Sequence, residues 1–334
     1  MRPHQAEIWG LGSYVPDHIM TNEDWAQRVD TSHQWIVART GIETRRIADE
    51  DQSTIDLAEP AARAALEDAE LEVGEIDELI VATDTPEAYL PDTAAFLQER
   101  LGLNKISSFD LAGSGCAGFL QALDVARARV LSGIRERVLV VGVELLTRLM
   151  NWEDRNTCVL FGDAAGAMVV GGARESSLAR ILAAEAGTDG GRADLLGLTA
   201  GGTRVPFSLE GAQRGEHKAV FMHGREVFRE AVGRMAEVSQ EVLKRAGLAL
   251  KDIDLVVPHQ ANQRILQALT QRLGIDPQKV FSNVREFGNT GSASIPLAMD
   301  QLREQGGWPA EGTVLLVSFG AGLHWGATVL QAGG

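Results

Sequence analysis

Cys116 is the residue of this chain whose type and setting point most clearly to chemistry. It follows the small residues Gly113-Ser114-Gly115, and residues 117 to about 129 after it carry the apolar periodicity of a buried helix. Small residues allow a sharp turn and let a substrate come close. A thiol at a helix N-terminus faces unpaired backbone N–H groups and the positive end of the helix dipole, and both favour the nucleophilic thiolate. The sequence therefore predicts a nucleophile here, and the alternative is a small core thiol.

His259 and Asn289 occupy comparable places. His259 follows the apolar run Leu255-Val256-Val257-Pro258, and Asn289 lies in the loop Gly288-Asn289-Thr290-Gly291, which opens another helix. Each stands at the C-terminal end of a strand-like segment, where open α/β sheets build their sites. A thiol attacks a carbon electrophile, and a neutral His and an Asn can donate hydrogen bonds to the oxyanion that develops. Either residue alone is more often structural, but together with the cysteine they predict one catalytic site.

The elements that must position these residues occur twice along the chain. A helical pattern, a turn and a buried strand in residues 61–83 are echoed by residues 242–259. Alternating helical and continuous apolar patterns predict an α/β fold, with mixed sheets covered by helices on both faces. We expect two pseudo-duplicated halves, residues 1–172 with the cysteine and residues 173–334 with the histidine and the asparagine. The cysteine and the asparagine hold equivalent places in these halves, so they can meet at the pseudo-twofold axis.

Ordered motifs run along nearly the whole chain. They are Gly10-Leu11-Gly12-Ser13-Tyr14-Val15-Pro16, Trp35-Ile36-Val37-Ala38-Arg39-Thr40-Gly41-Ile42, the cysteine segment, Phe161-Gly162-Asp163-Ala164-Ala165-Gly166-Ala167, His259-Gln260-Ala261-Asn262, Gly288-Asn289-Thr290 and Phe319-Gly320-Ala321-Gly322-Leu323-His324-Trp325-Gly326. Any single motif is weak, but their order is specific, and together they resemble the β-ketoacyl-acyl carrier protein synthase III family. These are the initiating condensing enzymes of type II fatty acid synthesis, within the thiolase-like superfamily. The resemblance implies a thiolase-like fold with five layers, α-β-α-β-α.

The resemblance also implies a reaction in two steps. Cys116 first takes the acyl group of an acyl-coenzyme A. Malonyl-acyl carrier protein then loses carbon dioxide, and its carbanion attacks the acyl-cysteine to give a β-ketoacyl thioester. His259 and Asn289 would stabilise the enolate, and the backbone N–H groups of Cys116 and Ala321 would hold the acyl oxyanion. We expect no metal and no cofactor, because coenzyme A and phosphopantetheine thioesters are substrates.

Further residues match family positions that bind substrate. Trp35 and Arg39 are expected to hold the adenine end of coenzyme A, with Arg155 on the opposite side, because a guanidinium stacks on aromatic rings and binds phosphate. Leu90 would line the acyl pocket of a partner subunit, so the resemblance implies a homodimer. Positions along the substrate tunnel are matched by Phe161, Arg225, Phe228, Asn262 and Arg264.

The composition bounds the partners and the location. The 334 residues carry a net charge of −15, which argues against binding to nucleic acid or to anionic membranes. No apolar run of about 18 residues predicts a membrane span. Two cysteines suggest no disulfide framework, and the start of the sequence has no signal-peptide pattern, so we expect a cytoplasmic protein. An acidic enzyme needs a local basic patch to dock an acidic carrier protein, and the candidates are Arg229, Arg264 and Arg272.

The chain departs from the family pattern at four places, so its sequence does not identify the acyl donor or the carrier. The segment Gly113-Ser114-Gly115 makes the loop before the cysteine one residue longer than usual, which could shift the acyl-oxyanion geometry. Arg225 stands where Asn is common, Leu90 replaces a common aromatic residue, and Gln271 occupies a basic docking position. The starter acyl group, its attachment to coenzyme A or to a carrier, and the pathway are therefore not determined by these residues.

Four alternative functions belong to classes of protein that share the thiolase-like fold. A thiolase needs a second cysteine near the C-terminus, where Phe319-Gly320-Ala321-Gly322 has none. A hydroxymethylglutaryl-coenzyme A synthase needs a glutamate near the nucleophile, for which Glu87 is the candidate, although the Gly-Asn-Thr segment disfavours it. A noncatalytic chain-length partner would lack the cysteine. The nearest rival is a relative in specialised, polyketide-type metabolism that condenses two carrier-bound chains or transfers an acyl group without decarboxylation.

Overall fold

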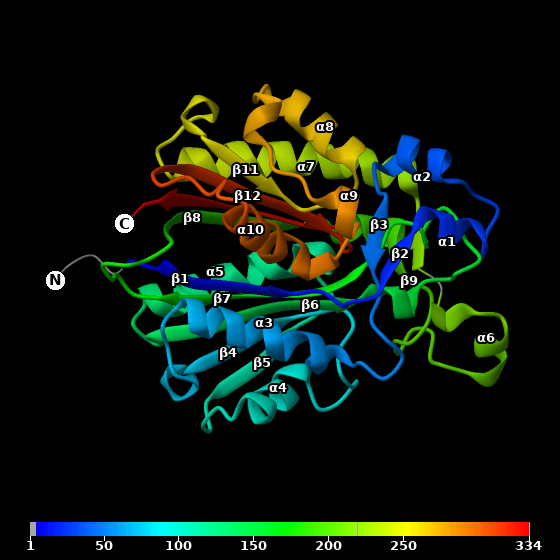
Figure 1. Cartoon of the computed structure of the whole chain (residues 1–334), viewed down its shortest axis with the longest axis horizontal. Coiled ribbons are helices and arrows are strands. Elements are labelled where there is room, and N and C mark those ends of the chain that lie inside the picture. Colours follow the sequence, from blue (N-terminus) through cyan, green and yellow to red (C-terminus); the bar gives the residue numbers. More distant parts are fainter. Residues whose placement is uncertain (1–4, 219, 334) are drawn as a thin grey trace.

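A computed structural model describes residues 5–218 and 220–333 (Figure 1). Its strands are β1 (Glu7–Tyr14), β2 (Ile19–Thr21), β3 (Thr44–Arg46), β4 (Glu78–Ala82), β5 (Ser107–Leu111), β6 (Arg137–Leu145), β7 (Asp163–Gly171), β8 (Ala179–Thr188), β9 (Leu196–Leu198), β10 (Val220–Met222), β11 (Leu255–Pro258), β12 (Gly312–Gly320) and β13 (His324–Ala332). Its helices are α1 (Asn22–Ala26), α2 (His33–Thr40), α3 (Thr54–Asp68), α4 (Thr93–Leu101), α5 (Gly118–Leu131), α6 (Leu209–Gln213), α7 (Gly224–Arg245), α8 (Gln263–Leu273), α9 (Val284–Phe287) and α10 (Ser294–Glu304).

The main strands of the described chain form one nine-stranded sheet in the order β11-β12-β13-β8-β1-β7-β6-β4-β5. Strands β5, β4 and β6 run parallel, and β6, β7 and β1 pair antiparallel. In the other half β11 and β12 run parallel, and β12, β13 and β8 pair antiparallel. A short antiparallel pairing of β1 with β8, at Glu7↔Arg180 and Ile8↔Ala179, joins the two halves of the sheet.

The two halves repeat the same strand order. Strands β4, β6, β7 and β1 correspond to β11, β12, β13 and β8, with the same sequence of parallel and antiparallel pairs. The counterpart of β5 is a single parallel bridge between Val256 and Val280. The predicted pseudo-duplication is therefore visible in the topology. The division at residues 172 and 173 stays a prediction; it falls in the connection between β7 and β8.

Helices and strands stack in five layers (Figure 1). Helices α3 and α4 cover one outer face, α7 and α8 cover the other, and α5 and α10 lie between the two halves of the sheet. The central helices contact sheet on two sides, so their sequences are apolar around most of the circumference. In α5, for example, Phe119, Leu120, Leu123, Ala126 and Val130 are all buried. This confirms the expected α/β fold in five layers.

Both central helices begin beside the predicted site, because α5 follows Cys116 and α10 follows Asn289. Smaller elements surround this end of the molecule. The paired strands β2 and β3 pack with α1 and α2, which lie between them in the chain, and α6 projects from the connection between the paired strands β9 and β10 (Figure 1). Among the described residues no helix has the length and apolarity to cross a bilayer.

Candidate active site

Cys116, His259 and Asn289 line one cavity of about 1390 Å³. Cys116 lies in the 3-10 turn Gly115–Ala117, between the end of β5 and the start of α5. His259 follows the last residue of β11, and Asn289 follows α9. The Cys116 Sγ is 3.7 Å from Asn289 Oδ1. The fold thus brings together, from both halves, the three side chains that the sequence singled out.

The carboxamide of Asn289 is held in one orientation. Its Oδ1 accepts the Gly291 N–H at 2.9 Å, and its backbone is bonded to the neighbouring segment, with Asn289 N–H donating to Leu160 O at 2.8 Å and Gly162 N–H donating to Asn289 O at 3.0 Å. Because the oxygen is engaged, the Nδ2 group is the end left without a protein partner in the described chain. It is therefore available as a donor to a ligand.

His259 is 2% exposed and neutral. Burial lowers the pKa of its imidazole to about 3. Its Nδ1 lies 2.8 Å from Ser294 Oγ, which also accepts the Gln260 N–H at 2.9 Å. With the Ser294 hydroxyl as the donor to Nδ1, the remaining ring proton lies on Nε2. The ring is then a neutral donor from Nε2.

The thiol of Cys116 is protonated at rest, so the expectation of a thiolate is wrong. Burial, together with the nearby carboxyl groups of Glu144 and Asp84, raises its pKa to about 12. The cysteine itself lies in a 3-10 turn, and α5 begins only at Gly118. Burial and two acidic neighbours raise the pKa of the thiol by more than the helix N-terminus lowers it. Attack by this thiol must be coupled to loss of its proton.

Gly115 and Gly320 allow the turn that contains Cys116 to pack directly against the turn that connects β12 and β13. A Cβ on Gly320 would meet Cys116 N at 2.5 Å, and a Cβ on Gly115 would meet Ala321 N at 2.4 Å. The two backbones therefore lie in direct contact, which glycine alone permits. Cys116 and Ala321 both line the cavity, and their backbones lie in adjacent turns.

The wall of the same cavity contains most of the predicted substrate residues. They are Arg39, Phe161, Arg225, Phe228, Asn262 and Arg264. The side chain of Asn262 also caps α8, since Oδ1 accepts the Ile265 N–H at 3.0 Å, so only its amide protons can reach a ligand. The guanidinium groups of Arg39 and Arg155 lie 4.3 and 5.2 Å from the centre of the Trp35 ring.

Trp35 and Arg155 do not themselves line the cavity, and three further predicted residues also lie outside its wall. Arg229 is exposed on α7, 3.4 Å from Glu230, and Arg272 is exposed in the last turn of α8. Leu90 projects from the loop after β4 with 86% of its surface exposed, next to Tyr89 at 84%. Within one subunit none of the three reaches the catalytic cysteine's cavity, although Tyr89 contributes to its edge.

The structure adds residues that the sequence reasoning missed. Glu144 lines the cavity, is 1% exposed and accepts hydrogen bonds from Ser292 Oγ at 2.7 Å and Thr85 Oγ1 at 2.8 Å. Burial and the neighbouring Asp84 raise its pKa to about 8. In the sequence, Glu144 could have been noticed as the single acidic residue in the apolar segment that forms β6. Further apolar lining comes from Met222, Ala261 and Ile265.

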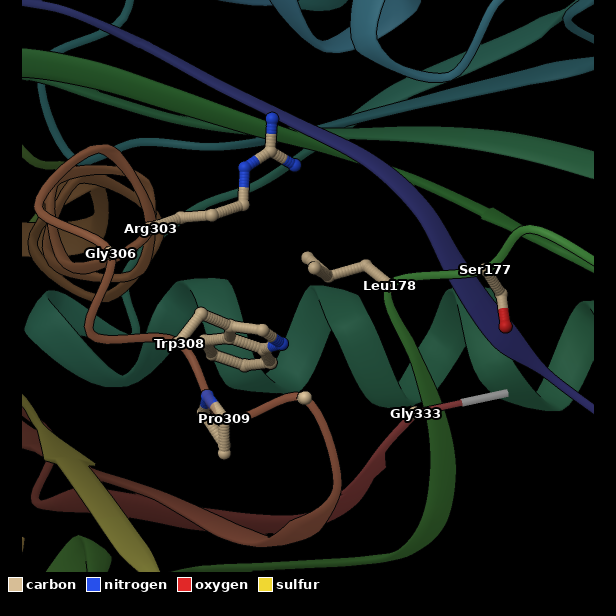
Figure 2. A pocket seen from close by; sticks show the side chains of 8 residues that line it. Ser177, Leu178, Arg303, Gly306, Trp308, Pro309 and Gly333 are labelled. Atoms are coloured by element: carbon tan, nitrogen blue, oxygen red, sulfur yellow. The ribbon is translucent and has the colours of Figure 1, made fainter.

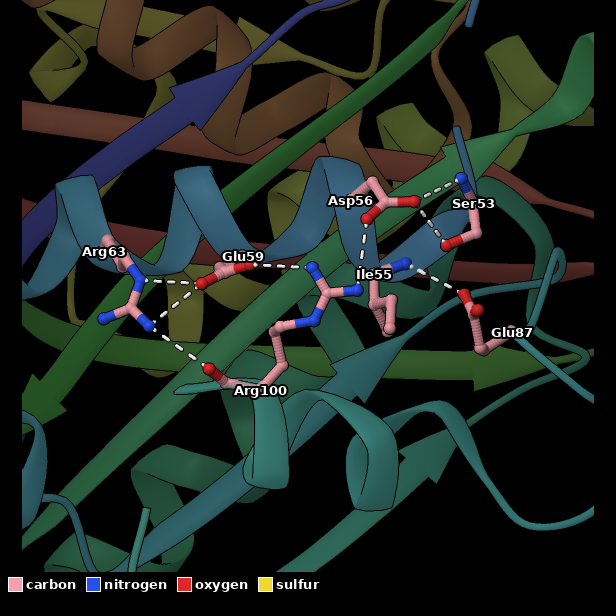
Figure 3. Close-up of polar contacts among 7 residues, drawn as sticks. All are labelled: Ser53, Ile55, Asp56, Glu59, Arg63, Glu87 and Arg100. Carbon is pink, nitrogen blue, oxygen red and sulfur yellow. Dashed lines mark hydrogen bonds and ion pairs between the residues drawn. The ribbon is translucent and has the colours of Figure 1, made fainter. Parts of the chain in front are cut away.

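Glu87 is engaged elsewhere (Figure 3). Its carboxylate accepts the Ile55 N–H at 3.0 Å at the start of α3, beside the Arg100 network with Asp56 and Glu59. It is therefore not poised as a general acid or base for Cys116, which disfavours the hydroxymethylglutaryl-coenzyme A synthase alternative.

A second hollow of about 360 Å³ lies at the far end of α10 from Ser294 (Figure 2). Arg303 and Trp308 border it, and Arg303 is paired with Asp68 through two hydrogen bonds. It contains none of the predicted catalytic residues.

Comparison with known proteins identifies the family. The models "3-Oxoacyl-[acyl-carrier-protein (ACP)] synthase III" and its C-terminal counterpart match residues 109–190 and 243–332. A β-ketoacyl-[acyl-carrier-protein] synthase III of Caldanaerobacter subterraneus is 46% identical over 98% of this chain and 97% of its own length.

Two solved structures extend this likeness. The β-ketoacyl-[acyl carrier protein] synthase III of Thermus thermophilus is 44% identical, with a TM-score of 0.88 over 98% of this chain and 99% of that one. A priming β-ketosynthase of a polyketide biosynthetic pathway is 35% identical, with a TM-score of 0.90 over 100% of this chain and 98% of that one. With its thiolase-like fold, the chain belongs to the β-ketoacyl-acyl carrier protein synthase III family.

Proposed function

We propose that this enzyme condenses an acyl-coenzyme A starter with malonyl-acyl carrier protein and so initiates fatty acid synthesis. The observation that carries the proposal is the convergence, in one cavity, of a thiol, a neutral buried histidine and an amide held in one orientation. These groups suit a carbonyl reaction that passes through oxyanions. Family membership supports the same activity.

In the first half-reaction the Cys116 sulfur attacks the thioester carbonyl. The thiol proton leaves, a new C–S bond forms, and coenzyme A departs as the free thiol. The Cys116 and Ala321 N–H groups hold the oxyanion of the tetrahedral intermediate. The contact between their two turns supports this role, because both residues line the cavity and their backbones are adjacent.

In the second half-reaction the malonyl thioester loses carbon dioxide. The electrons of the broken C–C bond form an enolate, whose oxygen is stabilised by His259 Nε2–H and Asn289 Nδ2–H. The carbanion attacks the acyl-cysteine, the C–S bond breaks, and the cysteine regains its proton. A neutral histidine serves this role because it donates without adding charge, and burial keeps its pKa at about 3. No cofactor enters this proposal.

We also propose which residues contact coenzyme A and the carrier protein. Arg39, Trp35 and Arg155 would hold the adenine end of coenzyme A, as their stacked arrangement supports. Arg264 at the cavity mouth, with Arg229 and Arg272, would dock the acidic carrier despite the chain's net charge of −15.

We further propose a cytoplasmic homodimer in which Leu90 completes the partner's acyl pocket. The exposure of two large side chains at one loop tip, Tyr89 and Leu90, supports an interface there, since such apolar surface is normally covered. A priming role in polyketide synthesis is the second candidate, supported by the 35% identity to a priming β-ketosynthase.

Substitution of the nucleophile tests the proposal. The variant Cys116→Ala should fold and gain no acyl mass from a panel of acyl-coenzyme A thioesters, whereas the wild type gains one acyl group. The matched control is Cys158→Ala, because Cys158 is the other cysteine and is buried away from the cavity. Acylation of the Cys116→Ala variant, or none of the wild type, would contradict the proposed chemistry.

A further inference from the structure

The loop that precedes the nucleophile has little rigidity of its own. Residues 112–115 connect β5 to the cysteine turn, and the backbone of Gly113 and Gly115 is left-handed, with φ of +80° and +53°. Ala112 and Gly113 are exposed to the cavity. Glycine populates many backbone conformations, so a loop of this composition needs external anchors to keep one geometry.

Asp84 supplies such an anchor. Its Oδ1 accepts the Gly113 N–H at 2.7 Å, and the Gly115 N–H lies near enough to lower the pKa of the same carboxyl. Strands β4 and β5 are parallel neighbours, so a side chain just beyond the end of β4 reaches the loop just beyond the end of β5. On the other side of the loop, Ser114 Oγ donates to Gln121 Oε1 at 2.6 Å.

Asp84 is itself held by its surroundings. Its backbone N–H donates to both oxygens of Glu144 at 3.2 Å, and Glu144 is bonded to Thr85 and Ser292. His324 acts electrostatically on the Asp84 carboxyl and bonds to Thr188 Oγ1 at 2.8 Å. The backbone of Asp84 is thus held by Glu144 beside the loop that its side chain bonds.

The loop position matters because Gly115 touches the opposite turn. A Cβ on Gly115 would lie 2.4 Å from Ala321 N, so a shift of Gly115 moves the Cys116 N–H relative to the Ala321 N–H. These are the two donors proposed to hold the acyl oxyanion. A misplacement of about 1 Å in such a site can cost on the order of 10²-fold in rate.

We propose that Asp84 is a positioning residue for the acylation step, whose carboxylate fixes the elongated nucleophile loop and thereby the Cys116 half of the oxyanion site. This inference rests on the proposed function. The same carboxylate also disfavours the thiolate, so anchoring and charge act in opposite directions on the reaction rate.

Two substitutions separate these effects. Asp84→Asn keeps an oxygen that can accept the Gly113 N–H but removes the charge, whereas Asp84→Ala removes both. With the acyl-coenzyme A that labels the wild type fastest, Asp84→Ala should acylate about 10²-fold more slowly. Asp84→Asn should stay within about threefold of the wild type. Malonyl decarboxylation, which depends on His259 and Asn289, should be retained by both variants.

The control is Asp92→Ala, because Asp92 is an acidic residue close by in the chain that makes no side-chain cap bond to α4. Circular dichroism and thermal melts check folding, and Asp84→Ser replaces the alanine variant if that one unfolds. Equal acylation rates for the alanine variant and the wild type, or equal losses in the alanine and asparagine variants, would overturn the anchoring role. A wild type that no acyl-coenzyme A labels would instead overturn the proposed function.

Discussion

Gly320→Ala tests the oxyanion site most directly. The added Cβ would lie 2.5 Å from Cys116 N, 2.6 Å from Ser114 O and 2.8 Å from Ala117 N. All three are backbone atoms of the nucleophile turn, so no flexible side chain can move aside. The two turns must separate by several tenths of an ångström, and the Cys116 N–H moves away from the position where the acyl oxygen develops its charge.

The expected loss follows from that displacement. Removal of one oxyanion donor costs roughly 10²–10³ in rate, and overpacking costs about 1–3 kcal/mol in the free energy of unfolding. Acyl transfer to Cys116, measured by mass spectrometry after rapid mixing with acyl-coenzyme A, should slow by that factor. Malonyl decarboxylation should be nearly unchanged, because His259 and Asn289 do not lie on this turn.

Gly118→Ala is the matched control. Gly118 lies two residues after the nucleophile, but the Cβ that it would add meets its nearest atom, Ser292 Oγ, at an ordinary 3.4 Å. This variant should acylate at nearly the wild-type rate. If Gly320→Ala acylates as fast as Gly118→Ala while both remain folded, the Cys116 and Ala321 N–H groups do not form the acyl oxyanion site.

Three further predictions concern other parts of the site. Asn289→Ala should keep acylation and lose roughly 10²–10³ in malonyl decarboxylation, measured by carbon dioxide release; equal loss in both steps would reassign its role. The folded pKa of Glu144 is raised from 4.5 to about 8, so the neutral form favours folding, and this stabilisation should be lost as pH rises from about 4.5 to 8. The slope is at most about 1.4 kcal/mol per pH unit, and denaturant unfolding of Glu144→Gln should lack it; identical slopes would contradict the raised pKa. Leu90→Phe should shift starter preference toward acetyl, since each methylene that fits contributes about 0.8 kcal/mol, and an unchanged chain-length profile would remove Leu90 from the acyl pocket.

Much of the fold could be predicted because its signals are local. Continuous apolar runs marked buried strands such as β4 and β11, and the apolar periodicity after Cys116 marked α5 as a buried helix. The order of these patterns repeated, so the pseudo-duplication was also readable. The positions of Cys116, His259 and Asn289 at strand ends followed from the same patterns.

The family resemblance identified several positions that bind substrate, but it did not reveal the hydrogen bonds that each side chain makes within the protein. Asn262 was expected along the tunnel, and the structure shows that its oxygen is committed to capping α8. Glu87 was a conceivable acid near the nucleophile, and it instead bonds the start of α3. Such local hydrogen bonds depend on how segments distant in sequence meet.

By itself, the sequence determined the fold class, the duplication and the three chemistry-bearing residues, because strand and helix periodicity and strand ends are encoded in short segments. Only the tertiary structure decided their protonation. The helix start suggested a thiolate, but burial and the carboxyl groups of Glu144 and Asp84 raise the pKa of Cys116, and burial lowers that of His259. A pKa depends on solvent exclusion and on nearby charges, and both come from segments that meet only in the folded chain.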